Sequence, residues 1–489
     1  MAIFEKFIPG LHRFDKHLPT RNSILLSKPG RTLVLVLLFA FTPLALPTLE
    51  HRLTLKGQSY REILPDAREL IAFRHQSAPA TSLPSSLEPG EAQVAIKPAA
   101  GTCRDQLIED PEHTLDAFNA HLLLTEQRSP AAITRIVHYG DSPITNDGIT
   151  GTVRELLQKR FGDSGHGFIL VDRPWDWYGH QSIEFQTGGG WSSASLMAPK
   201  SSDGQLGLGG VVSSAYGPGK WAQYRPSSIG STGKKFSRMD VYYLDKPGGG
   251  RFTVSANGRE EVVSTDSTEQ KPAFYQLSAA EGVSSFQLRT IEGDVSLYGV
   301  VLENDDPGVV YDSLGVNGAF AGLLATTMNG PHWTEQLQHR NPNLVILNYG
   351  TNESEYASDD QMQRYDRELR EVVNRVRRAL PEASILIVSP MDRGKRVPGG
   401  RVVTMPAIPK IVDMQRRVAV ETHCAFLNLF AAMGGDGTMA RWHEGKKHLV
   451  GGDLTHPTAE GAQTVGNLIY MALMEDYDNF REKQQIVKK

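Results

Sequence analysis

The sequence predicts an α/β protein in which a three-layer α/β domain is interrupted by an antiparallel β-sandwich and preceded by an N-terminal transmembrane helix. Three observations carry this prediction. Short apolar strands alternate with helices in residues 131–180 and 309–480, short alternating strands separated by Gly and Ser fill residues 181–308, and an uncharged apolar run occupies residues 32–49. At 489 residues the chain exceeds the usual size of one domain. Its formal net charge of -4 gives no electrostatic reason to expect nucleic-acid binding.

The N-terminal apolar run favours a membrane anchor. Leu33–Leu49 reads LVLVLLFAFTPLALPTL, and residues 1–31 before it are rich in Lys and Arg. This arrangement is typical of a cytoplasmic basic segment followed by a spanning helix, with the rest of the chain exported. A cleaved signal peptide is the alternative, although the basic segment is long for one. Pro43 and Pro47 disfavour a helix buried in a soluble core.

Connecting segments flank the folded regions. Residues 50–130 are expected to form a linker and lead-in helices, because Ser77–Gly101 is rich in Ser, Pro, Ala and Glu, whereas Thr114–Arg128 has apolar residues at helical spacing. Residues 481–489 are expected to form a polar tail.

The α/β domain is predicted from strands and helices that alternate along the chain. The β-rich run Ala132–His138 leads through a short loop to a helical pattern over Thr152–Phe161. Later, Asn343–Asn348 and Ser384–Ser389 are short apolar strands on either side of the amphipathic helix expected over Asp360–Leu380. Continuous apolar strands of this kind are typical of a parallel sheet covered on both faces.

Residue types for nucleophilic catalysis occur at two places in this pattern. Ser142 follows the first strand, where open α/β sheets place reactive groups, and Asp453 and His456 lie together in DLTH. A serine needs an imidazole to take its proton, and the imidazole needs a carboxylate to orient it. Two other segments, Gly162-Asp163-Ser164 and Asp312-Ser313-Leu314, look similar to the Ser142 motif, but the first reads as a helix-terminating turn and the second lacks the preceding glycine.

Four short blocks resemble the SGNH (GDSL-type) hydrolase family in order. IVHYGDSPITND resembles the first block with Ser142 at the nucleophile position, and GVNGAFA resembles the second with Gly318. NYGTNES resembles the third with Asn352, and DLTH resembles the last with Asp453 and His456. The resemblance implies a flavodoxin-like three-layer fold for the hydrolase domain.

The resemblance also implies a mechanism. His456 would be the general base and then the general acid, with Asp453 orienting it. The Ser142 NH, the Gly318 NH and the Asn352 amide would form an oxyanion hole, where one donor is typically worth about 3 to 4 kcal/mol. The family needs no metal and no other cofactor.

The sequence departs from the family pattern at two positions. Pro143 follows the serine where Leu is common, and Glu353 stands where Asp often follows the Asn, which puts the hydrogen bonds of that loop in question. The resemblance covers Ile133–His180 and Val309–Met474. Esterases that remove O-acetyl groups from peptidoglycan have a similar β-rich module between their first and second blocks, so the insert adds a looser likeness to them.

Cysteine and histidine usage argues against a metal site. Cys103 and Cys424 are the only cysteines, which leaves a single disulfide open but supplies no Cys-x-x-Cys motif. His443 and His448 lie near the DLTH block without the tight helical spacing of a zinc site.

Three functions fit these observations. The first is an extracytoplasmic esterase that removes small acyl groups, expected to be O-acetyl groups, from a cell-envelope glycan. The second is an O-acetyltransferase that moves acetyl to a glycan hydroxyl, with a membrane acyltransferase as a partner. The third is a non-catalytic glycan-binding protein. Trp175, Trp177 and Tyr178 could stack on sugars, although packing is the favoured role for such aromatic residues.

Overall fold

The computed structural model describes the chain from residue 107 onward almost completely. The described residues are 107–199, 203–228, 230–355 and 358–487, with the backbone of two short strands, β1 (Thr54–Leu55) and β2 (Gln58–Ser59), which pair antiparallel. Gly101–Lys489 form one compact unit. The expected cytoplasmic segment at residues 1–31 and the expected transmembrane run at 32–49 lie outside the described residues.

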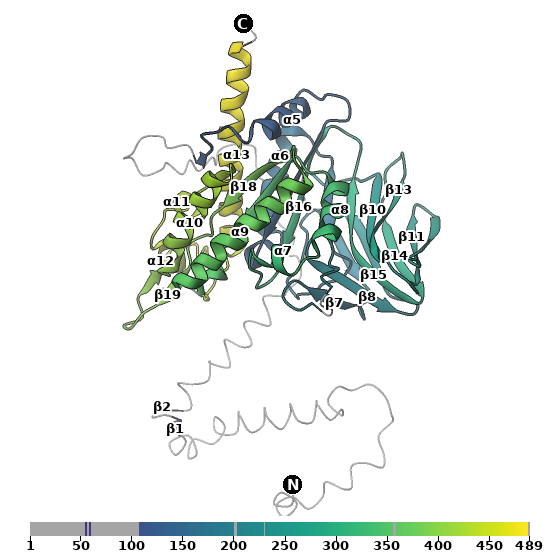
Figure 1. Ribbon diagram of the computed structural model, residues 1–489, viewed down its shortest axis with the longest axis horizontal. Coiled ribbons are helices and arrows are strands. Elements are labelled where there is room, and N and C mark those ends of the chain that lie inside the picture. The colour runs from purple at the N-terminus through teal and green to yellow at the C-terminus, as the bar shows by residue number, and fades with distance from the viewer. Residues whose placement is uncertain are drawn as a thin grey trace, which may run out of the picture. The chain divides into compact units, whose positions relative to one another are not determined.

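A six-stranded sheet forms the centre of the α/β domain (Figure 1). Its strands, in spatial order, are β16 (Gly308–Gly315), β4 (Ile133–Gly140), β17 (Leu344–Asn348), β18 (Ser384–Val388), β21 (Ala425–Leu427) and β3 (Ile108–Glu109). All neighbours are parallel except β21 and β3. Numbered by their order in the sequence, the parallel strands follow one another across the sheet as 2-1-3-4-5, with β4 between β16 and β17. This is the flavodoxin-like order. The three strands predicted from the sequence are confirmed.

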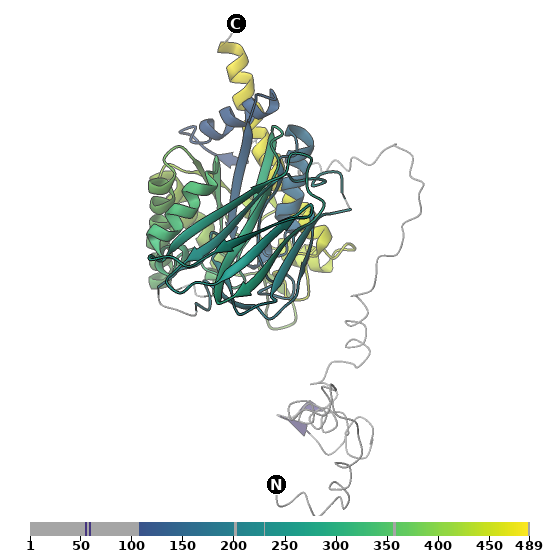
Figure 2. The same cartoon turned by 90° about the vertical axis from the view of Figure 1, so that its right-hand side faces the viewer.

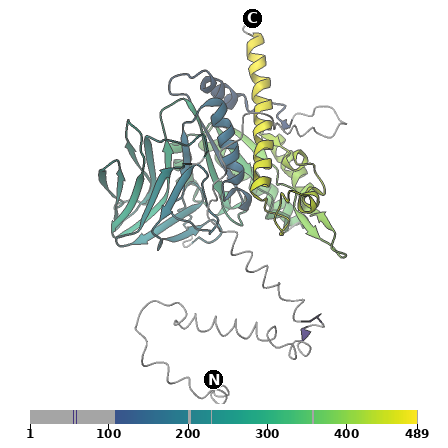
Figure 3. The same ribbon diagram turned by 180° about the vertical axis from the view of Figure 1, so that it is seen from behind.

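Helices cover both faces of this sheet. One face carries α5 (Asp116–Glu126), α6 (Gly148–Phe161) and α13 (Ala459–Val487), and the other carries α8 (Gly330–Arg340), α9 (Asp359–Ala379) and α10 (Ala407–Glu421) (Figures 1 and 3). Alternate strand residues enter two separate cores, so Ile136 packs with the α6 and α13 side and Val137 with the α8 to α10 side. The continuous apolar strands are thus explained by burial on both faces.

Short elements complete the α/β domain. These are η3 (Ser142–Ile144), α7 (Leu323–Thr326), η4 (Glu353–Glu355), β19 (Gly394–Arg396), β20 (Val402–Thr404), α11 (Leu429–Ala432) and α12 (Thr438–Glu444). The predicted amphipathic helix α9 is confirmed and begins at a capping box made by Ser358 and Gln361.

The inserted region is a sandwich of two antiparallel sheets (Figure 2). One contains β13 (Lys271–Ser278), β10 (Arg238–Asp245), β15 (Asp294–Glu303), β8 (Val211–Tyr216) and β7 (Ser192–Ser195), with β5 (Gly165–Ile169) also paired to β15. The other contains β12 (Arg259–Ser264), β11 (Arg251–Ala256), β14 (Phe286–Glu292), β9 (Trp221–Pro226) and β6 (Ile183–Thr187). The expected start at residue 181 falls after β5. A short apolar strand that follows a helix reads as part of a parallel sheet, and only its pairing with β15 assigns it to the sandwich.

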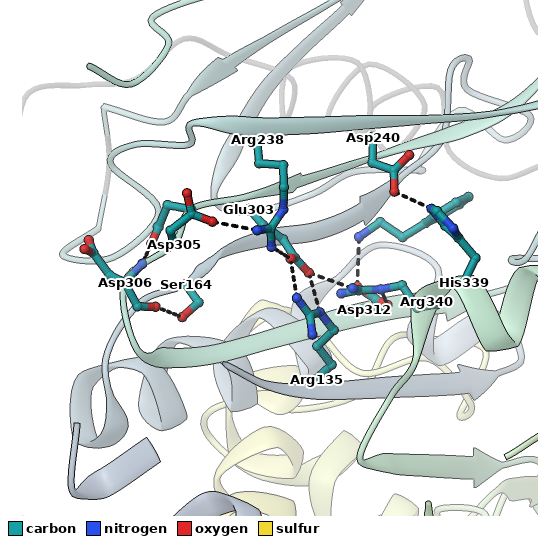
Figure 4. Close-up of polar contacts among 12 residues, drawn as sticks. Arg135, Ser164, Arg238, Asp240, Glu303, Asp305, Asp306, Asp312, His339 and Arg340 are labelled. Carbon is teal, nitrogen blue, oxygen red and sulfur yellow. Dashed lines mark hydrogen bonds and ion pairs between the residues drawn. The ribbon is translucent and has the colours of Figure 1, made fainter. Parts of the chain in front are cut away.

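A cluster of buried charges joins the sandwich to the α/β domain (Figure 4). Arg340 of α8 donates to both carboxylate oxygens of Asp312 on β16, at 2.6 and 3.0 Å, and to Glu303 on β15 at 2.6 Å. Glu303 also accepts from Arg135 of β4 at 2.9 Å and from Arg238 of β10. Burial works to raise the pKa of Glu303, but the surrounding arginines hold it below its usual value. Because each charge is paired, these residues connect the two sheets without leaving an isolated buried ion.

The C-terminal helix runs further than the sequence suggested. The polar tail expected from residue 481 is helical as far as Val487, and Arg481 donates to Glu126 of α5 at 3.0 Å. The polar residues in this stretch are good helix formers, and the ion pair extends the contact between the two helices. No helix in the described ranges is both long enough and apolar enough to cross a bilayer.

Cys424 is buried beside β21 and forms no disulfide with any residue that the structure describes. Burial raises its pKa. Cys103, the other half of the disulfide left open by the sequence, lies outside the described residues.

Candidate active site

Three adjacent strand ends bring the sequence blocks together at one edge of the parallel sheet. In the register of the sheet, Gly140 of β4 is level with Gly315 of β16 and with Asn348 of β17. Ser142, Gly318 and Asn352 follow these strand ends within a few residues. The carboxyl edge of a parallel sheet is where open α/β folds place their ligands.

The turn that carries Ser142 is tight and buried. A side chain at Gly140 would lie 2.5 Å from Ile144 and 3.0 Å from the Asn348 carbonyl oxygen, so only glycine fits below this turn. Thr145 closes it by donating its hydroxyl to the Ser142 carbonyl at 2.7 Å. Asp141 accepts from the Thr351 NH at 3.2 Å and thereby links the first block to the third. Burial raises the Asp141 pKa to about 7.

Ser142, His456 and Asp453 form one chain of hydrogen bonds. The His456 Nε2 atom lies 2.7 Å from Ser142 Oγ, and His456 Nδ1 lies 2.6 Å from Asp453 Oδ2. The other Asp453 oxygen accepts from the NH groups of Thr455 and His456, each at 3.1 Å. Partial burial works to raise the Asp453 pKa, but these hydrogen bonds lower it. With the carboxylate ionised, the tautomer that fits carries its proton on Nδ1 and leaves Nε2 to accept from the serine hydroxyl.

The loop holding Asp453 and His456 is strained. Leu454 between them has a φ of 58° and is buried, and its NH donates to the Gly451 carbonyl at 3.0 Å. Residues other than glycine rarely adopt this left-handed conformation, and they keep it only where contacts with the surrounding structure hold it in place. Here the Gly394 NH, donating to the Leu454 carbonyl at 2.8 Å, supplies one such contact.

Gly318 and Asn352 lie in two loops that contact each other. Gly318 has a φ of 75°, in the left-handed region that favours glycine. The Asn352 side-chain amide donates to the Ala319 carbonyl at 2.9 Å. An amide carries two hydrogens, so this bond orients Asn352 and leaves the second hydrogen for another acceptor.

Glu353 replaces the aspartate of the family pattern and still holds its loop. Its Oε1 accepts from the Ala321 NH at 2.8 Å, which ties the second block to the third. Burial raises the Glu353 pKa to about 8. Glu353 is also one of the residues that line a pocket of about 360 Å³. The other lining residues belong to the second-block loop, α7 and the first turns of α9.

Arg393 is a site residue that the sequence analysis missed. It donates to the Thr351 carbonyl at 2.8 Å and to Ser354 Oγ at 3.1 Å, and also to Thr455 Oγ1 at 3.3 Å. It therefore joins the third block to the loop next to His456. Its position just after the carboxyl end of a buried strand was the available signal, because sheet-end loops carry functional residues in this class of fold.

The two serine motifs that look similar to the first block are structural. Ser164 donates to the Asp306 carbonyl at 2.5 Å, and Asp312 belongs to the buried ionic cluster (Figure 4). Within the described ranges, no group of three or more His, Cys, Asp and Glu side chains is arranged to hold a metal ion.

A parallel α/β sheet with a linked serine, histidine and aspartate at its carboxyl edge defines an ester hydrolase of the SGNH/GDSL class. Residues 278–464 match the GDSL-like lipase/acylhydrolase family, so the chain carries a domain of this family. The matched segment contains Gly318, Asn352, Asp453 and His456. Ser142 lies outside it and is brought to the site by the fold.

One solved structure shares the architecture of this chain. It is a peptidoglycan O-acetylesterase, 22% identical, with a TM-score of 0.64; the match covers 76% of this chain and 99% of that chain. The two segments of the α/β domain make up less than half of the sequence, so a match of this extent includes residues of the sandwich. The likeness shows a common fold.

Other solved structures are more distant. A family two carbohydrate esterase from Clostridium thermocellum is 11% identical over 60% of this chain and 98% of its own, and an acetyl xylan esterase is 14% identical over 34% and 80%; both have a TM-score of 0.26. No curated protein sequence is significantly similar to this chain.

Proposed function

We propose that this chain is a serine esterase that removes O-acetyl groups from a cell-envelope glycan through an acyl-Ser142 intermediate. The observation that carries the proposal is the continuous hydrogen-bonded chain from Asp453 through His456 to Ser142. A serine hydroxyl becomes a useful nucleophile when an oriented imidazole can take its proton.

The reaction follows from these contacts. His456 Nε2 takes the proton from Ser142 as Oγ bonds to the acetyl carbonyl carbon. The negative charge that develops on the carbonyl oxygen is stabilised by the NH groups of Ser142 and Gly318 and by the free amide hydrogen of Asn352. The imidazolium returns its proton to the departing sugar oxygen as the carbon–oxygen bond breaks. Water, activated by the same imidazole, then releases acetate and restores the serine.

Exposure of the site is what hydrolysis requires. The side chains of His456 and Asp453 are 47% and 52% exposed, so water has access to the base that would activate it. The acetyl group and the glycan are supported by the fold shared with the peptidoglycan O-acetylesterase. Transfer to a glycan hydroxyl uses the same residues and differs only in the acceptor.

The location of the enzyme is also a proposal. The basic segment and apolar run at residues 1–49 support anchoring in a membrane with the catalytic domain outside the cytoplasm. A membrane acyltransferase would be the natural acyl donor if transfer is the physiological reaction.

Hydrolysis of p-nitrophenyl acetate and p-nitrophenyl octanoate by the purified full-length chain tests the proposal. We expect preference for acetate and a loss of at least about 10³-fold in Ser142→Ala. Ser164→Ala is the matched control and should remain active, because Ser164 bonds only to backbone far from the site. Equal rates for wild type and Ser142→Ala would refute the acyl-serine mechanism. Acetylated product on added chito-oligosaccharide would assign the transferase reaction instead.

A further inference from the structure

An exposed tryptophan stands beside the nucleophile turn. Trp177 lies in the segment between β5 and β6 and is 53% exposed. Its Nε1 donates to Thr145 Oγ1 at 3.1 Å, and the same hydroxyl donates to the Ser142 carbonyl at 2.7 Å. One hydrogen-bonded side chain therefore separates the indole ring from the backbone of the nucleophile.

The segment that carries Trp177 is fixed along the first block. The Gln181 NH donates to Asp147 Oδ2 at 2.8 Å, and Gly179 lies close to the backbone of Asn146. Asp147 itself is buried and paired with Arg154. Burial works to raise the pKa of Asp147, but Arg154 and further partners lower it to about 2, so this anchor stays charged at neutral pH.

The neighbouring aromatic residues of the same motif have structural roles. Tyr178 is buried, and its hydroxyl accepts from the Leu170 NH at 2.8 Å. Trp175 is partly buried and packs against the hydrophobic core that the sandwich shares with the α8 to α10 side of the α/β domain. Trp177 is thus the ring of the three that remains open to solvent, and the packing role expected for the group holds only for the other two.

A second exposed apolar side chain of the insert borders the site. Met197 is 45% exposed, and its Cε would lie 3.6 Å from a side chain built at Gly318. The insert therefore contributes one apolar surface next to Ser142 and another next to the expected oxyanion donor.

We infer that Trp177 is the stacking platform for a pyranose ring of the acetylated glycan, and that it holds the ester-bearing sugar over Ser142. This inference rests on the proposed esterase function. The CH-rich face of a sugar ring pairs with an aromatic face, and the sugar hydroxyls remain in contact with polar groups. The surroundings fit this ligand, because exposed polar residues flank both ends of the indole contact. In the sequence, Asp176 is next to Trp177, and Asn146 is next to Thr145, which accepts the indole hydrogen bond. A lipid or protein surface would call for a wider contiguous apolar patch.

Kinetics on two substrates of different size test the assignment. With the full-length chain, we expect Trp177→Ala to keep kcat/KM for p-nitrophenyl acetate within about twofold, since that ester has no sugar to stack. For O-acetylated chitopentaose, we expect kcat/KM to fall about tenfold or more, mainly through KM. Trp177→Phe keeps an aromatic face without the hydrogen bond to Thr145. Its kcat/KM for the O-acetylated chitopentaose should lie between the values of wild type and Trp177→Ala. Tyr216→Ala is the matched control, because Tyr216 is an 86% exposed ring of the sandwich at the end of β8.

Binding separates this inference from the esterase proposal. Chitopentaose titrated into the Ser142→Ala protein should bind about tenfold more weakly when Trp177 is also changed to Ala, and as before when Tyr216 is changed. Unchanged binding and unchanged glycan kinetics in Trp177→Ala would overturn the stacking role, as would the absence of saturable binding. Loss of p-nitrophenyl acetate hydrolysis in Ser142→Ala would uphold the esterase proposal in either case.

Discussion

Ser142 Oγ lies 2.7 Å from His456 Nε2, although 314 positions separate the two residues in the chain. The contact joins the turn after β4 to the loop before α13. Pairing of helix α6 with α13, which flank these two loops, brings them to the same edge of the sheet.

Replacing the acid of the hydrogen-bonded chain should slow the reaction without disturbing the fold. Asp453→Asn keeps the shape of the side chain but favours the wrong tautomer of His456, because an amide can donate to Nδ1. We expect kcat for p-nitrophenyl acetate to fall by about 10²- to 10⁴-fold with little change in the urea unfolding midpoint. A variant with wild-type kcat would show that Asp453 does not orient His456.

Glu353 should make stability depend on pH. Its folded pKa, raised to about 8 by burial, lies above the usual value of a glutamate, so its contribution to the free energy of unfolding is complete below about pH 4.5. That contribution is lost as pH rises through about 8. Glu353→Gln cannot ionise, and its free energy of unfolding should therefore fall less between pH 5 and pH 9.

Urea unfolding of both proteins across this pH range measures the difference. Asp141, whose pKa burial raises to about 7, titrates in both proteins, and its charge is one of the causes of the raised Glu353 pKa. Parallel curves for wild type and Glu353→Gln would contradict the assignment of the buried, protonated carboxyl.

Arg393 should act as a positioning residue. It touches no reacting atom but joins the loop of Asn352 to the loop of His456 through Thr351 and Thr455. We expect Arg393→Ala to lower kcat by about 10- to 100-fold, because small displacements of catalytic groups are costly. Arg393→Lys should recover part of the loss.

A nearby arginine provides the control for this variant. Arg396→Ala, which removes an exposed contact with His443, should leave kcat unchanged. If Arg393→Ala and Arg396→Ala lowered kcat equally, the loss would be due to the β19–β20 hairpin as a whole and not to the hydrogen bonds by which Arg393 joins the two loops.

Breaking the buried ionic cluster should destabilise the whole compact unit. Arg340→Met leaves Asp312 without its buried partner and removes one of the charges that neutralise Glu303. We expect the free energy of unfolding to fall by about 3–5 kcal/mol. Arg251→Ala, which removes a half-exposed pair with Glu292 in the sandwich, should cost less than about 1 kcal/mol. Similar losses from both changes in urea unfolding would exclude a special role for the cluster.

Local patterns in the sequence were enough to predict the parallel sheet of the α/β domain, the amphipathic helix α9, an antiparallel sandwich in the insert, and Ser142, Asp453 and His456 as site residues. Local patterns carry this information, because the spacing of apolar residues along the chain indicates which face of a strand or helix is buried. The motif around Ser142 and the DLTH loop could be recognised for the same reason, since their residue types are set by chemistry.

The pairing of distant segments could be read only from the folded chain. The fold assigned β5 to the sandwich, gave the Glu353 carboxyl the Ala321 NH as a partner, and made Arg393 a bridge between two loops. It also separated Trp177, which is open to solvent, from the buried Tyr178. Such pairings depend on contacts between residues far apart in the chain, and neither composition nor local period contains them.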